Sequence, residues 1–526
     1  MKEQYLDSCI SQIRKILTLQ DRNEFSKTYG CFDRNYWHYK TRDFPSGMSQ
    51  EFTLALALVY TIKFPKNIFY KNRNIYKWVL AGLDNTITQS RSDGSLDDYY
   101  PYERALGASV FTTYALTQAC IILGLKNKTY NKYFFKSTSW MSKASESGLL
   151  TNHHAIEAMC YLNVYRLTNE KKYATIADKK IKQIISFQDK EGWFPEYDGC
   201  SPGYLTVTID FLSQYYIIRP CKSLKDSLLK AIDFFYNIQH PDGTCGGDYD
   251  SRNTSFFHPN GFEIMSSFSE KSLKIANSYL LARQRQVFPI QEDDYTIGHN
   301  LISNLNAFSN CKSRDFSMLN IKNKNISKTF FSSGIKVFGK EDIWSIFNYK
   351  KGGVCKIYNK NNSVYNYSGI IIKAKNKVYT NNILQPNTTC EVNENKIVID
   401  NYFISFNQKI PSLYNYFLFR SFLISFGKIK VISRITRKLL QKFLIYKKPI
   451  KKYFSKTNIT IEKNFLKINI KITGDFSGDE KVFMAQKFVP IYTAMSEYFT
   501  IEELNSKSIR LEKKDNQFSF EIKFKI

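Results

Sequence analysis

The chain has 526 residues, of which 43% are hydrophobic and 16% aromatic. This length and composition suit two or three folded domains and exclude a disordered protein. The 75 Lys and Arg residues outnumber the 47 Asp and Glu residues, which gives a formal net charge of +28. Such a charge suits an acidic glycan, an anionic membrane or nucleic acid as partner. The alternative is a lysine-rich bias spread over the whole surface.

Sequence motifs, cysteine spacing and apolar runs narrow the possible partners and locations of the protein. No zinc-finger, helix-turn-helix or RNA-recognition signature accompanies the charge, so we expect no nucleic-acid partner. The ten Cys residues form no CxxC pair and show no metal-ligand spacing, so we expect reduced cysteines and neither a metal nor a cofactor. Charged residues interrupt the apolar residues at the N-terminus, so we do not expect a signal peptide. We find no uninterrupted run of about 20 apolar residues, so we do not expect a membrane-spanning helix. We therefore expect a soluble, cytoplasmic protein.

Helical periodicity dominates the chain up to about residue 290. Apolar residues recur at spacings of three and four in 48–64, 74–88, 103–125, 223–239 and 270–284. Three of the loops between them share an Asp-Gly or Glu-Gly followed by aromatic and acidic residues, which is typical of repeated helical hairpins. A ring of hairpins, the α/α toroid, is the economical architecture, and a plain solenoid is the alternative.

From about residue 310 the period changes to two. Residues 368–380, 395–406, 458–474 and 516–526 alternate or run β-branched between Asn, Gly and Lys turns. This pattern predicts an antiparallel β-sandwich. The predicted parts are an α/α toroid domain over 1–290, a connector over 291–315 and a β-sandwich domain over 316–526.

One basic segment, 434–456, interrupts the strands. It is partly amphipathic and could rest on anionic lipid headgroups, which would place the protein peripherally at the inner face of the membrane. The alternative is a solvated basic helix or hairpin inserted between two strands.

The stretch "NHHAIEAM" places Asn152, His153 and His154 where a helix begins, although the chain has only six His residues. A helix N-terminus favours an anion, and Asn152 could also simply cap the helix. Tyr204 follows a Pro-Gly turn at the start of a later helix. Its position on the loop side makes it a candidate, and core packing is the alternative.

Two further loops carry polar and aromatic groups. The groups in "GGDYDSRNTSFFHPNGFE" are Arg252, Asn253, His258 and Glu263, and those in "DRNYWHYKTRDFPSG" include Trp37, His38, Lys40 and Arg42. Aromatic rings suit the faces of sugar rings, and arginine suits a carboxylate. Each residue could equally be part of a surface salt bridge.

Five motifs in chain order together resemble the heparinase II/III-like proteins, above all those found among bacterial surface-polysaccharide biosynthesis proteins. These motifs are "DRNYWHYKTRDFPSG", "DGSLDDYYPYERAL", "NHHAIEAM", "EGWFPEYDGCSPGYLTVTIDFL" and "SRNTSFFHPNGFE". The resemblance covers most of the helical half, and the strand-rich half matches in type alone. It implies an incomplete α/α toroid followed by an antiparallel β-sandwich.

The resemblance also implies a chemistry, the C5 proton abstraction of a uronic-acid-containing polysaccharide. By motif, Asn152 and His153 match the family's Asn-His pair, and Tyr204 matches its Tyr. Related lyases often add a His from the β domain, but no His follows His299 here. His258, Arg252 or a second Tyr would have to replace it, or the activity has changed or been lost.

The predicted site follows from these loops. The catalytic set is Asn152, His153, Tyr204 and Arg252. The substrate-binding set is Trp37, His38, Lys40, Arg42, Tyr99, Tyr100, Glu103, Arg104, His154, Asn253, His258 and Glu263. The expected partner is an acidic polysaccharide or a lipid-linked oligosaccharide.

Several activities stay open. Abstraction of the C5 proton leads to a β-elimination lyase or, if C5 is reprotonated, to a uronate C5-epimerase. A glycoside hydrolase on the same toroid would use paired carboxylates, chosen from Asp97, Asp98, Glu103 and Asp198. A non-catalytic glycan-binding or assembly protein would keep the groove without turnover.

Overall fold

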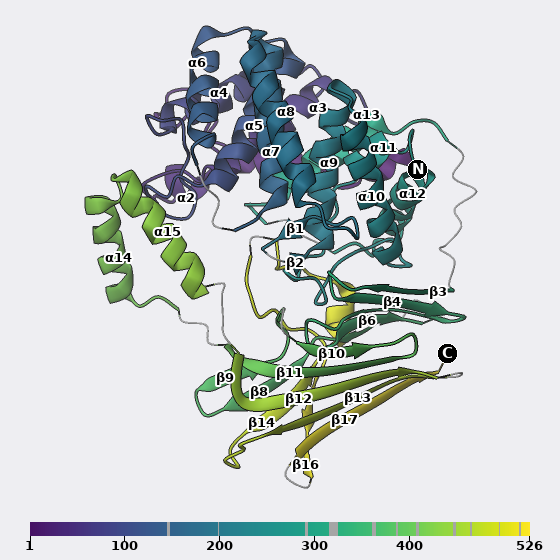
Figure 1. The fold of residues 1–526 in the computed structure, drawn as a ribbon. Coiled ribbons are helices and arrows are strands. Elements are labelled where there is room, and N and C mark those ends of the chain that lie inside the picture. The colour runs from purple at the N-terminus through teal and green to yellow at the C-terminus, as the bar shows by residue number, and fades with distance from the viewer. Residues whose placement is uncertain are drawn as a thin grey trace.

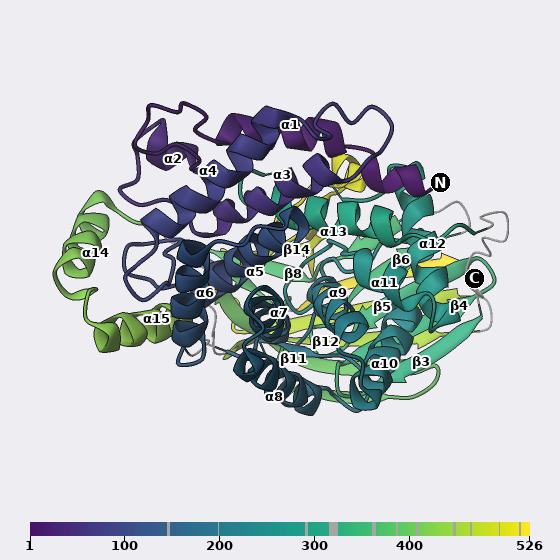
Figure 2. The ribbon, with the colours of Figure 1, turned by 90° about the horizontal axis from the view of Figure 1, so that it is seen from above.

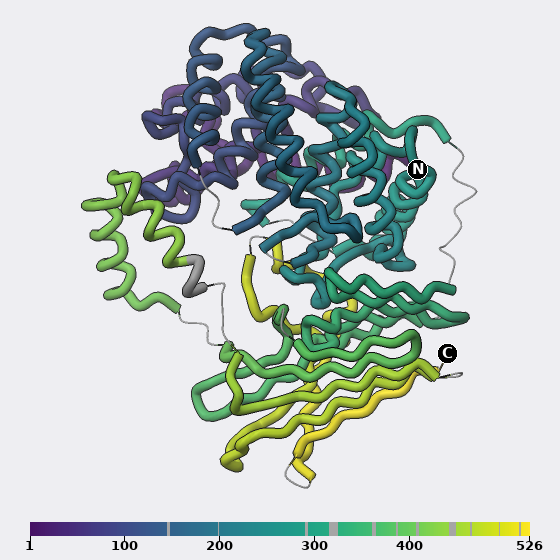
Figure 3. The backbone as a smooth tube through the Cα atoms, viewed as in Figure 1, coloured from purple at the N-terminus to yellow at the C-terminus, as the bar shows by residue number. Residues whose placement is uncertain are grey.

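A computed structural model shows a helical body stacked on a strand-rich body (Figures 1 and 3). It describes all residues except 145–147, 198, 290–292, 315–324, 360–363, 386–387, 407–409, 445–448, 463–464, 494, 515–516 and 526, and of 441–444 it describes the backbone alone.

The helical body begins with the 3-10 helix η1 (Lys2–Leu6) and also contains η2 (Met48–Glu51). Its α-helices are α1 (Cys9–Leu19), α2 (Arg34–Trp37), α3 (Phe52–Thr61), α4 (Arg73–Gln89), α5 (Leu106–Leu123), α6 (Lys128–Met141), α7 (Thr151–Thr168), α8 (Lys171–Phe187), α9 (Pro202–Ile218), α10 (Lys222–Ile238), α11 (Asn260–Met265), α12 (Glu270–Gln284) and α13 (Ile297–Asn310). A small hairpin of β1 (Pro195–Glu196) and β2 (Gly199–Cys200) lies between α8 and α9.

The helices form an inner ring and an outer layer (Figure 2). Along the inner ring, α3, α5, α7, α9, α11 and α13 each contact the next, and α13 also contacts α3. Inner helices such as α5 bury residues on all sides, whereas outer helices such as α8 bury one stripe and expose lysines. The toroid that the sequence predicts as incomplete therefore has a ring of contacts that closes.

The ring closes through a helix that lies inside the predicted connector. Helix α13 falls within 291–315, and its Leu301, Ile302 and Leu305 belong to the helical core. The helical part thus extends past the predicted boundary at 290, and the first strand of the next part begins at Ile326.

Helix α5 combines length with high hydropathy. Among the described residues it is the one helix long and apolar enough to cross a membrane, and 72% of its 18 residues are buried inside the protein. A buried core helix has the same length and hydropathy, and α5 is such a helix in the inner ring.

The strand-rich part contains two antiparallel sheets. The five-stranded sheet has the order β3 (Ile326–Phe330), β4 (Ile335–Lys340), β5 (Ile343–Asn348), β6 (Val354–Tyr358), β7 (Val364–Tyr367). The ten-stranded sheet has the order β15 (Ser508–Leu511), β14 (Lys481–Ala485), β8 (Ile370–Ala374), β9 (Lys377–Thr380), β11 (Lys396–Phe406), β12 (Pro449–Ile461), β13 (Phe465–Gly474), β17 (Gln517–Lys525), β16 (Lys513–Lys514), and β10 (Thr389–Val392) pairs with β11.

The five-stranded sheet is covered on both faces. Val337 and Ile346 join the core of the helical body, whereas Phe347 and Ile357 pack with Ile470 of the ten-stranded sheet in a second core. Strand β5 is accordingly buried along its whole length, as expected of a strand between two layers. The strand-rich character agrees with the sequence, and the description as a β-sandwich stays a prediction.

A helical arm is inserted between β11 and β12. It consists of α14 (Leu413–Phe426) and α15 (Lys430–Leu444), and it projects beside α2 at the edge of the molecule (Figure 1). The insertion therefore begins before the predicted segment 434–456, and residues 449–456 belong to β12. A 3-10 helix, η3 (Ile501–Asn505), precedes β15.

Candidate functional site

The N-terminus of α7 is held by a carboxylate from the β1–β2 hairpin. Glu196 forms a β-bridge with Leu150, and the N–H of Tyr197 donates to the carbonyl of Leu149 at 3.0 Å. The backbone N–H and the Nδ2 of Asn152 donate to Oε1 and Oε2 of Glu196, each at 2.9 Å. Asn152 therefore lies inside the helix rather than at its cap position, which Leu150 occupies, and Glu196 takes the place of an anion at the helix end.

The carboxyl of Glu196 changes protonation near neutral pH. Burial raises its pKa to about 7, against the hydrogen bonds from Asn152 and the positive charges of His153 and Arg252. These opposing influences also mean that His153 and Arg252 lie close to this carboxyl. A buried carboxyl that titrates near 7 beside cationic groups is typical of a functional site.

The two adjacent histidines point to different neighbours. His153 faces α5, where its ring lies 6.0 Å from the ring of Phe111. A Cβ at Gly107 would lie 2.8 Å from Cε1 of His153, so the glycine leaves the room that the imidazole needs. The Nδ1 of His154 instead lies 3.4 Å from the Oε2 of Glu157 and 3.4 Å from the Nζ of Lys180 on α8. Consecutive helical residues are about 100° apart, which explains the divergence.

A buried aspartate brings the Arg252 loop to the start of α9. Asp250 accepts hydrogen bonds from Ser201 Oγ at 2.9 Å and from Thr254 Oγ1 at 2.5 Å. Ser201 directly precedes α9, whose first turn carries Tyr204. The same anchor therefore positions Arg252 and Tyr204 relative to each other, although they are far apart in the sequence.

Arg252 is buried over an aromatic ring. Its guanidinium carbon lies 4.0 Å from the ring centre of Tyr197, and Nη2 donates to the Tyr197 carbonyl at 3.2 Å. Within the described part of the chain its Nε has no hydrogen-bond partner. A buried donor without a partner is costly, so this group is well suited to receive an anionic ligand.

Tyr204 keeps its proton at neutral pH. Burial raises its pKa above the ordinary value, the neighbouring Tyr197 and the carboxylate of Glu196 add to this, and the hydroxyl of Thr493 and the charge of Arg252 oppose it. A protonated phenol is a proton donor. The charge of Arg252 therefore does not lower the pKa of Tyr204 far enough for the phenol to act as a base at neutral pH.

The strand-rich part also reaches this site. Thr493 lies in the segment after β14 and is close to Tyr204. Lys351, between β5 and β6, donates to the carbonyls of Asp248 and Asp250 at 2.7 Å each and to Asn253 Oδ1 at 2.9 Å. The loop of Arg252 is therefore fixed from both bodies.

The loop between α4 and α5 contributes a tyrosine pair. The rings of Tyr99 and Tyr295 stack at 5.9 Å. Tyr99 is 64% exposed over its whole side chain, but its hydroxyl is enclosed, and this enclosure raises its pKa, with further contributions from Asp98, Glu103 and Tyr204. Tyr99 thus borders the site of Tyr204 and presents its ring to solvent.

The carboxylates of the same loop are buried and bound by backbone groups. Glu103 accepts from the N–H groups of Asp98 and Tyr99 at 3.1 and 2.7 Å, and burial, followed by the charge of Asp98, raises its pKa to about 8. Asp97 accepts from Arg91 Nε at 2.9 Å. These three carboxylates organise the loop, and Asp198 lies outside the described residues.

The predicted residues of the first loop make contacts of their own. Trp37 Nε1 donates to the carbonyl of Leu19 at 2.8 Å, and Arg42 pairs with Asp33 at 3.1 Å. His38 and Lys40 are exposed.

Other predicted residues lie deeper in the body. Asn253 receives Lys351, as described above. His258 is buried with Nδ1 3.6 Å from Asp210 Oδ2, and it lines a small cavity with His299. Glu263 accepts two hydrogen bonds from Arg314, at 2.7 and 2.8 Å.

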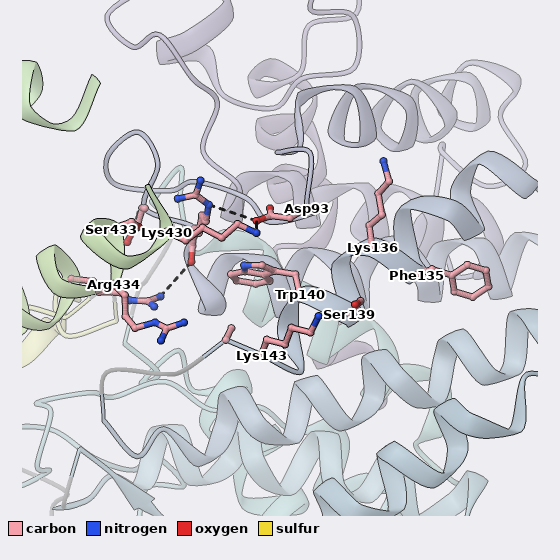
Figure 4. A pocket seen from close by; sticks show the side chains of 13 residues that line it. Asp93, Phe135, Lys136, Ser139, Trp140, Lys143, Lys430, Ser433 and Arg434 are labelled. Carbon is pink, nitrogen blue, oxygen red and sulfur yellow. Dashed lines mark hydrogen bonds and ion pairs between the residues drawn. The ribbon is translucent and has the colours of Figure 1, made fainter. Parts of the chain in front are cut away.

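A basic pocket lies between α6, the α4–α5 loop and α15 (Figure 4). Its cationic side chains are Arg104, Lys136, Lys143, Lys430, Arg434 and Arg437. Trp140 stands among them, and its acidic side chains are Asp93 and Glu103. Arg104 and Glu103 are predicted substrate-binding residues, and the predicted Tyr100 packs its ring 5.7 Å from Phe419 of α14.

No group of three or more metal-ligating side chains with suitable geometry occurs in the part of the chain that the structure describes.

Sequence reasoning misses Glu196, Tyr197, Tyr295, Thr493 and Lys351. A signal existed for the first two, since "WFPEYDG" places them in a loop already singled out. Lys351 and Thr493 carry no motif, and only the packing of the two bodies brings them to the site.

Comparisons with known proteins agree with the fold. No protein-family model matches the sequence, and no curated protein matches it. A chondroitin AC lyase of Streptomyces coelicolor is similar in structure, with a TM-score of 0.51 and 7% identity over 92% of this chain and 68% of that chain. The helical part is thus of the α/α toroid type, followed by a strand-rich domain.

Two further solved structures are similar at lower scores. A cellobiose 2-epimerase of Bacillus thermoamylovorans has a TM-score of 0.44 and 11% identity, over 57% of this chain and 98% of that chain. An unsaturated glucuronyl hydrolase of a Bacillus species has a TM-score of 0.40 and 11% identity, over 59% of this chain and 96% of that chain.

Proposed function

We propose that this protein is a heparinase II/III-like enzyme that acts on a uronic-acid-containing polysaccharide by abstraction of the C5 proton, as a β-elimination lyase. The observation that carries the proposal is the convergence of Asn152 and His153 at the start of α7, Glu196 of the β1–β2 hairpin, Tyr204 at the start of α9 and Arg252 of the loop after α10. The similarity to a chondroitin AC lyase supports the fold that such an enzyme needs.

The groups suit each step of the elimination. Arg252 and the amide of Asn152 hold the uronate carboxylate and neutralise the charge that develops on it, where a well-aimed donor contributes roughly 3–4 kcal/mol. His153 in its neutral form takes the C5 proton, since a neutral imidazole is a common general base. The C5–H electron pair forms the C4–C5 double bond, the C4–O4 bond breaks, and protonated Tyr204 gives its proton to O4.

The same groups permit a second outcome. If Tyr204 gave its proton to C5 on the opposite face of the ring, a new C5–H bond would replace the one that His153 broke, the C4–O4 bond would stay intact and the product would be the C5 epimer. Deuterium from the solvent would then enter C5 without chain cleavage.

The basic pocket supports an acidic substrate. It adjoins the site through the loop of Tyr99 and Glu103, and it combines cations with the ring of Trp140 (Figure 4). Arginine and lysine suit anionic groups of a glycan, and the indole suits a sugar face. We propose that residues of the polymer beyond the reacting uronate bind there.

The test is incubation of the purified chain with a panel of uronic-acid-containing polysaccharides in deuterated water. The readouts are ultraviolet absorbance of the unsaturated product and mass spectrometry of C5 deuterium. We expect Asn152→Ala, His153→Ala and Tyr204→Phe each to lower turnover by about 100-fold or more.

His154→Ala is the matched control, because its ring lies beside Glu157 and Lys180 rather than at the cluster. It should keep turnover within a few-fold. Full activity in the three cluster variants would contradict the proposal, and so would equal loss in the control.

A hydrolase remains the second candidate, because Glu103 with its raised pKa beside Asp98 could act as a general acid. Reducing ends without unsaturated product, lost in Glu103→Gln, would favour it. If the wild type bound the polymer without turnover, and the Tyr204→Phe variant bound it equally well, the protein would be a non-catalytic glycan-binding protein.

A further inference from the structure

The arm formed by α14 and α15 exposes apolar side chains to an unusual degree. In α14, Leu413 is 86%, Tyr414 70% and Phe417 65% exposed, and Leu423 is its one buried residue. The exposed set over the arm is Leu413, Tyr414, Tyr416, Phe417, Leu418, Phe422, Ile424, Phe426, Ile429, Val431, Ile435 and Leu439. So many exposed apolar side chains on two neighbouring helices indicate an interaction site.

The charge of the arm has one sign. Residues 413–444 contain seven Lys and Arg residues and no Asp or Glu. The cations Lys428, Arg434 and Lys438 are exposed on the arm itself. Helix α15 is thus basic and amphipathic, and it adjoins an aromatic, apolar α14.

The inner side of the arm is fixed to the helical body. Arg104 donates to the carbonyls of Gly427 and Lys428 at 3.2 and 3.1 Å. Ser433 Oγ donates to the carbonyl of Tyr102 at 2.7 Å, and Lys430 pairs with Asp93 at 3.0 Å. The arm is therefore fixed to the helical body at these positions, while the apolar side chains named above stay exposed.

We propose that the α14–α15 arm docks the protein onto the surface of an anionic lipid bilayer. Exposed Tyr, Phe, Leu and Ile side chains enter the boundary between headgroups and acyl chains, and the surrounding Lys and Arg meet the lipid phosphates. Each helix is too short to span the hydrocarbon core, which needs about 20 residues. The arm therefore lies in the interface.

Other occupants fit the arm less well. A second copy in a two-fold contact would bring its unbalanced cations against the same cations. A polyanion such as nucleic acid or a glycan would leave the apolar and aromatic side chains of α14 in water. A bilayer with anionic headgroups satisfies both the charge and the apolar surface.

The experiment is flotation of the full chain with vesicles of phosphatidylcholine alone and with about one third phosphatidylglycerol. We expect binding to the anionic vesicles that weakens with salt. The double variant Leu413→Ser with Phe417→Ser should bind at least 10-fold more weakly, and so should Lys428→Glu with Lys438→Glu.

Matched controls separate docking from general surface effects. Phe25 is 98% exposed on the helical body, so Phe25→Ser removes an exposed apolar ring elsewhere. Lys126→Glu with Lys128→Glu reverses two exposed charges at the α5–α6 turn. Both controls should bind as the wild type.

Unchanged vesicle binding in both arm variants would overturn the proposal. A second result would also overturn it. If the wild type did not bind vesicles but formed a dimer, and the Leu413→Ser with Phe417→Ser variant were a monomer, the arm would be a contact surface between two copies of the chain. Circular dichroism of each variant should match the wild type, since all four arm positions are solvent-exposed.

Discussion

Asn152 and Glu196 act as one unit at the residue scale. Both hydrogen bonds from Asn152 go to this carboxyl, so the orientation of the amide depends on a residue from another loop. Glu196 is in this sense a positioning residue, and its protonation state sets how much negative charge the site already holds.

Replacement of Glu196 tests its pKa. Because burial raises the folded-state pKa from about 4.5 to about 7, the folded protein binds more protons than the unfolded chain between these values. The ionised carboxyl then costs stability, which falls as pH rises through this window. Glu196→Gln keeps an acceptor and cannot ionise. We expect the free energy of unfolding of the variant to equal that of the wild type below pH 4.5. Above pH 7 it should exceed the wild-type value by up to about 3 kcal/mol.

Urea unfolding at a series of pH values measures this difference. A stability difference between the two proteins that does not change across the window would show that Glu196 is ionised in the folded protein throughout. Glu191→Gln is a comparison with the opposite sign, because the pKa of Glu191 is lowered.

Part of the site could be predicted from single residues. The rarity of His and its pairing with Asn152 single out the start of α7, and the Pro-Gly turn singles out Tyr204. Glu196 escaped because carboxylates in glycine-rich loops are common turn formers, and its partner lies 44 residues earlier in the chain. That pairing exists only once the β1–β2 hairpin lies against α7.

At the element scale, the loop of Arg252 depends on a lysine from the other body. Lys351 is buried and donates to three oxygens of this loop. Burial lowers its pKa to about 8, against the attraction of Asp248 and Asp250. The turn between β5 and β6 is thus a support of the site.

Lys351→Met should loosen this loop. It leaves three buried acceptors without their donor, which costs about 2–4 kcal/mol, and turnover should fall because Arg252 is no longer fixed. Thermal unfolding and kinetics with the polymer measure both effects. Lys350→Met is the neighbouring control, because Lys350 donates to the carbonyl of Ser332 instead. Equal losses of stability and turnover in the Lys351→Met and Lys350→Met variants would contradict the role of Lys351 in fixing the loop of Arg252.

Some elements could not be predicted from local pattern. Helix α13 follows the acidic stretch "EDD", and its apolar side is explained by contacts with α3 and α11 that close the ring. The sequence of α14, rich in Phe, Tyr, Leu and Ile, has the composition of a strand. The predicted ranges 74–88, 103–125, 223–239 and 270–284 lie within a few residues of the observed α4, α5, α10 and α12.

For the whole molecule, the two bodies share one core. Phe330, Val337, Ile346 and Tyr358 of the strand-rich part belong to the same cluster of buried residues as the helices. The order of helices before strands was readable from the change of period, but this shared core was not, because both faces of a doubly covered sheet look equally apolar in sequence.

A chain that ends at residue 314 should not fold on its own. It would expose the apolar surface that the five-stranded sheet covers, and we expect aggregation or a broad thermal transition. Size-exclusion chromatography and a thermal melt against the full chain measure this. A monomer that melts cooperatively at the full-length temperature would show that the helices need no cover.

The carboxyl that holds the start of α7 has one more consequence. A uronate entering beside Arg252 brings a second negative group next to Glu196, and two such groups favour sharing a proton over both being ionised. Under the proposed function, each molecule of ligand captured near pH 7 would draw a proton out of the buffer. The affinity for acidic sugars would then decline as the medium becomes alkaline, and a neutral sugar would escape this dependence.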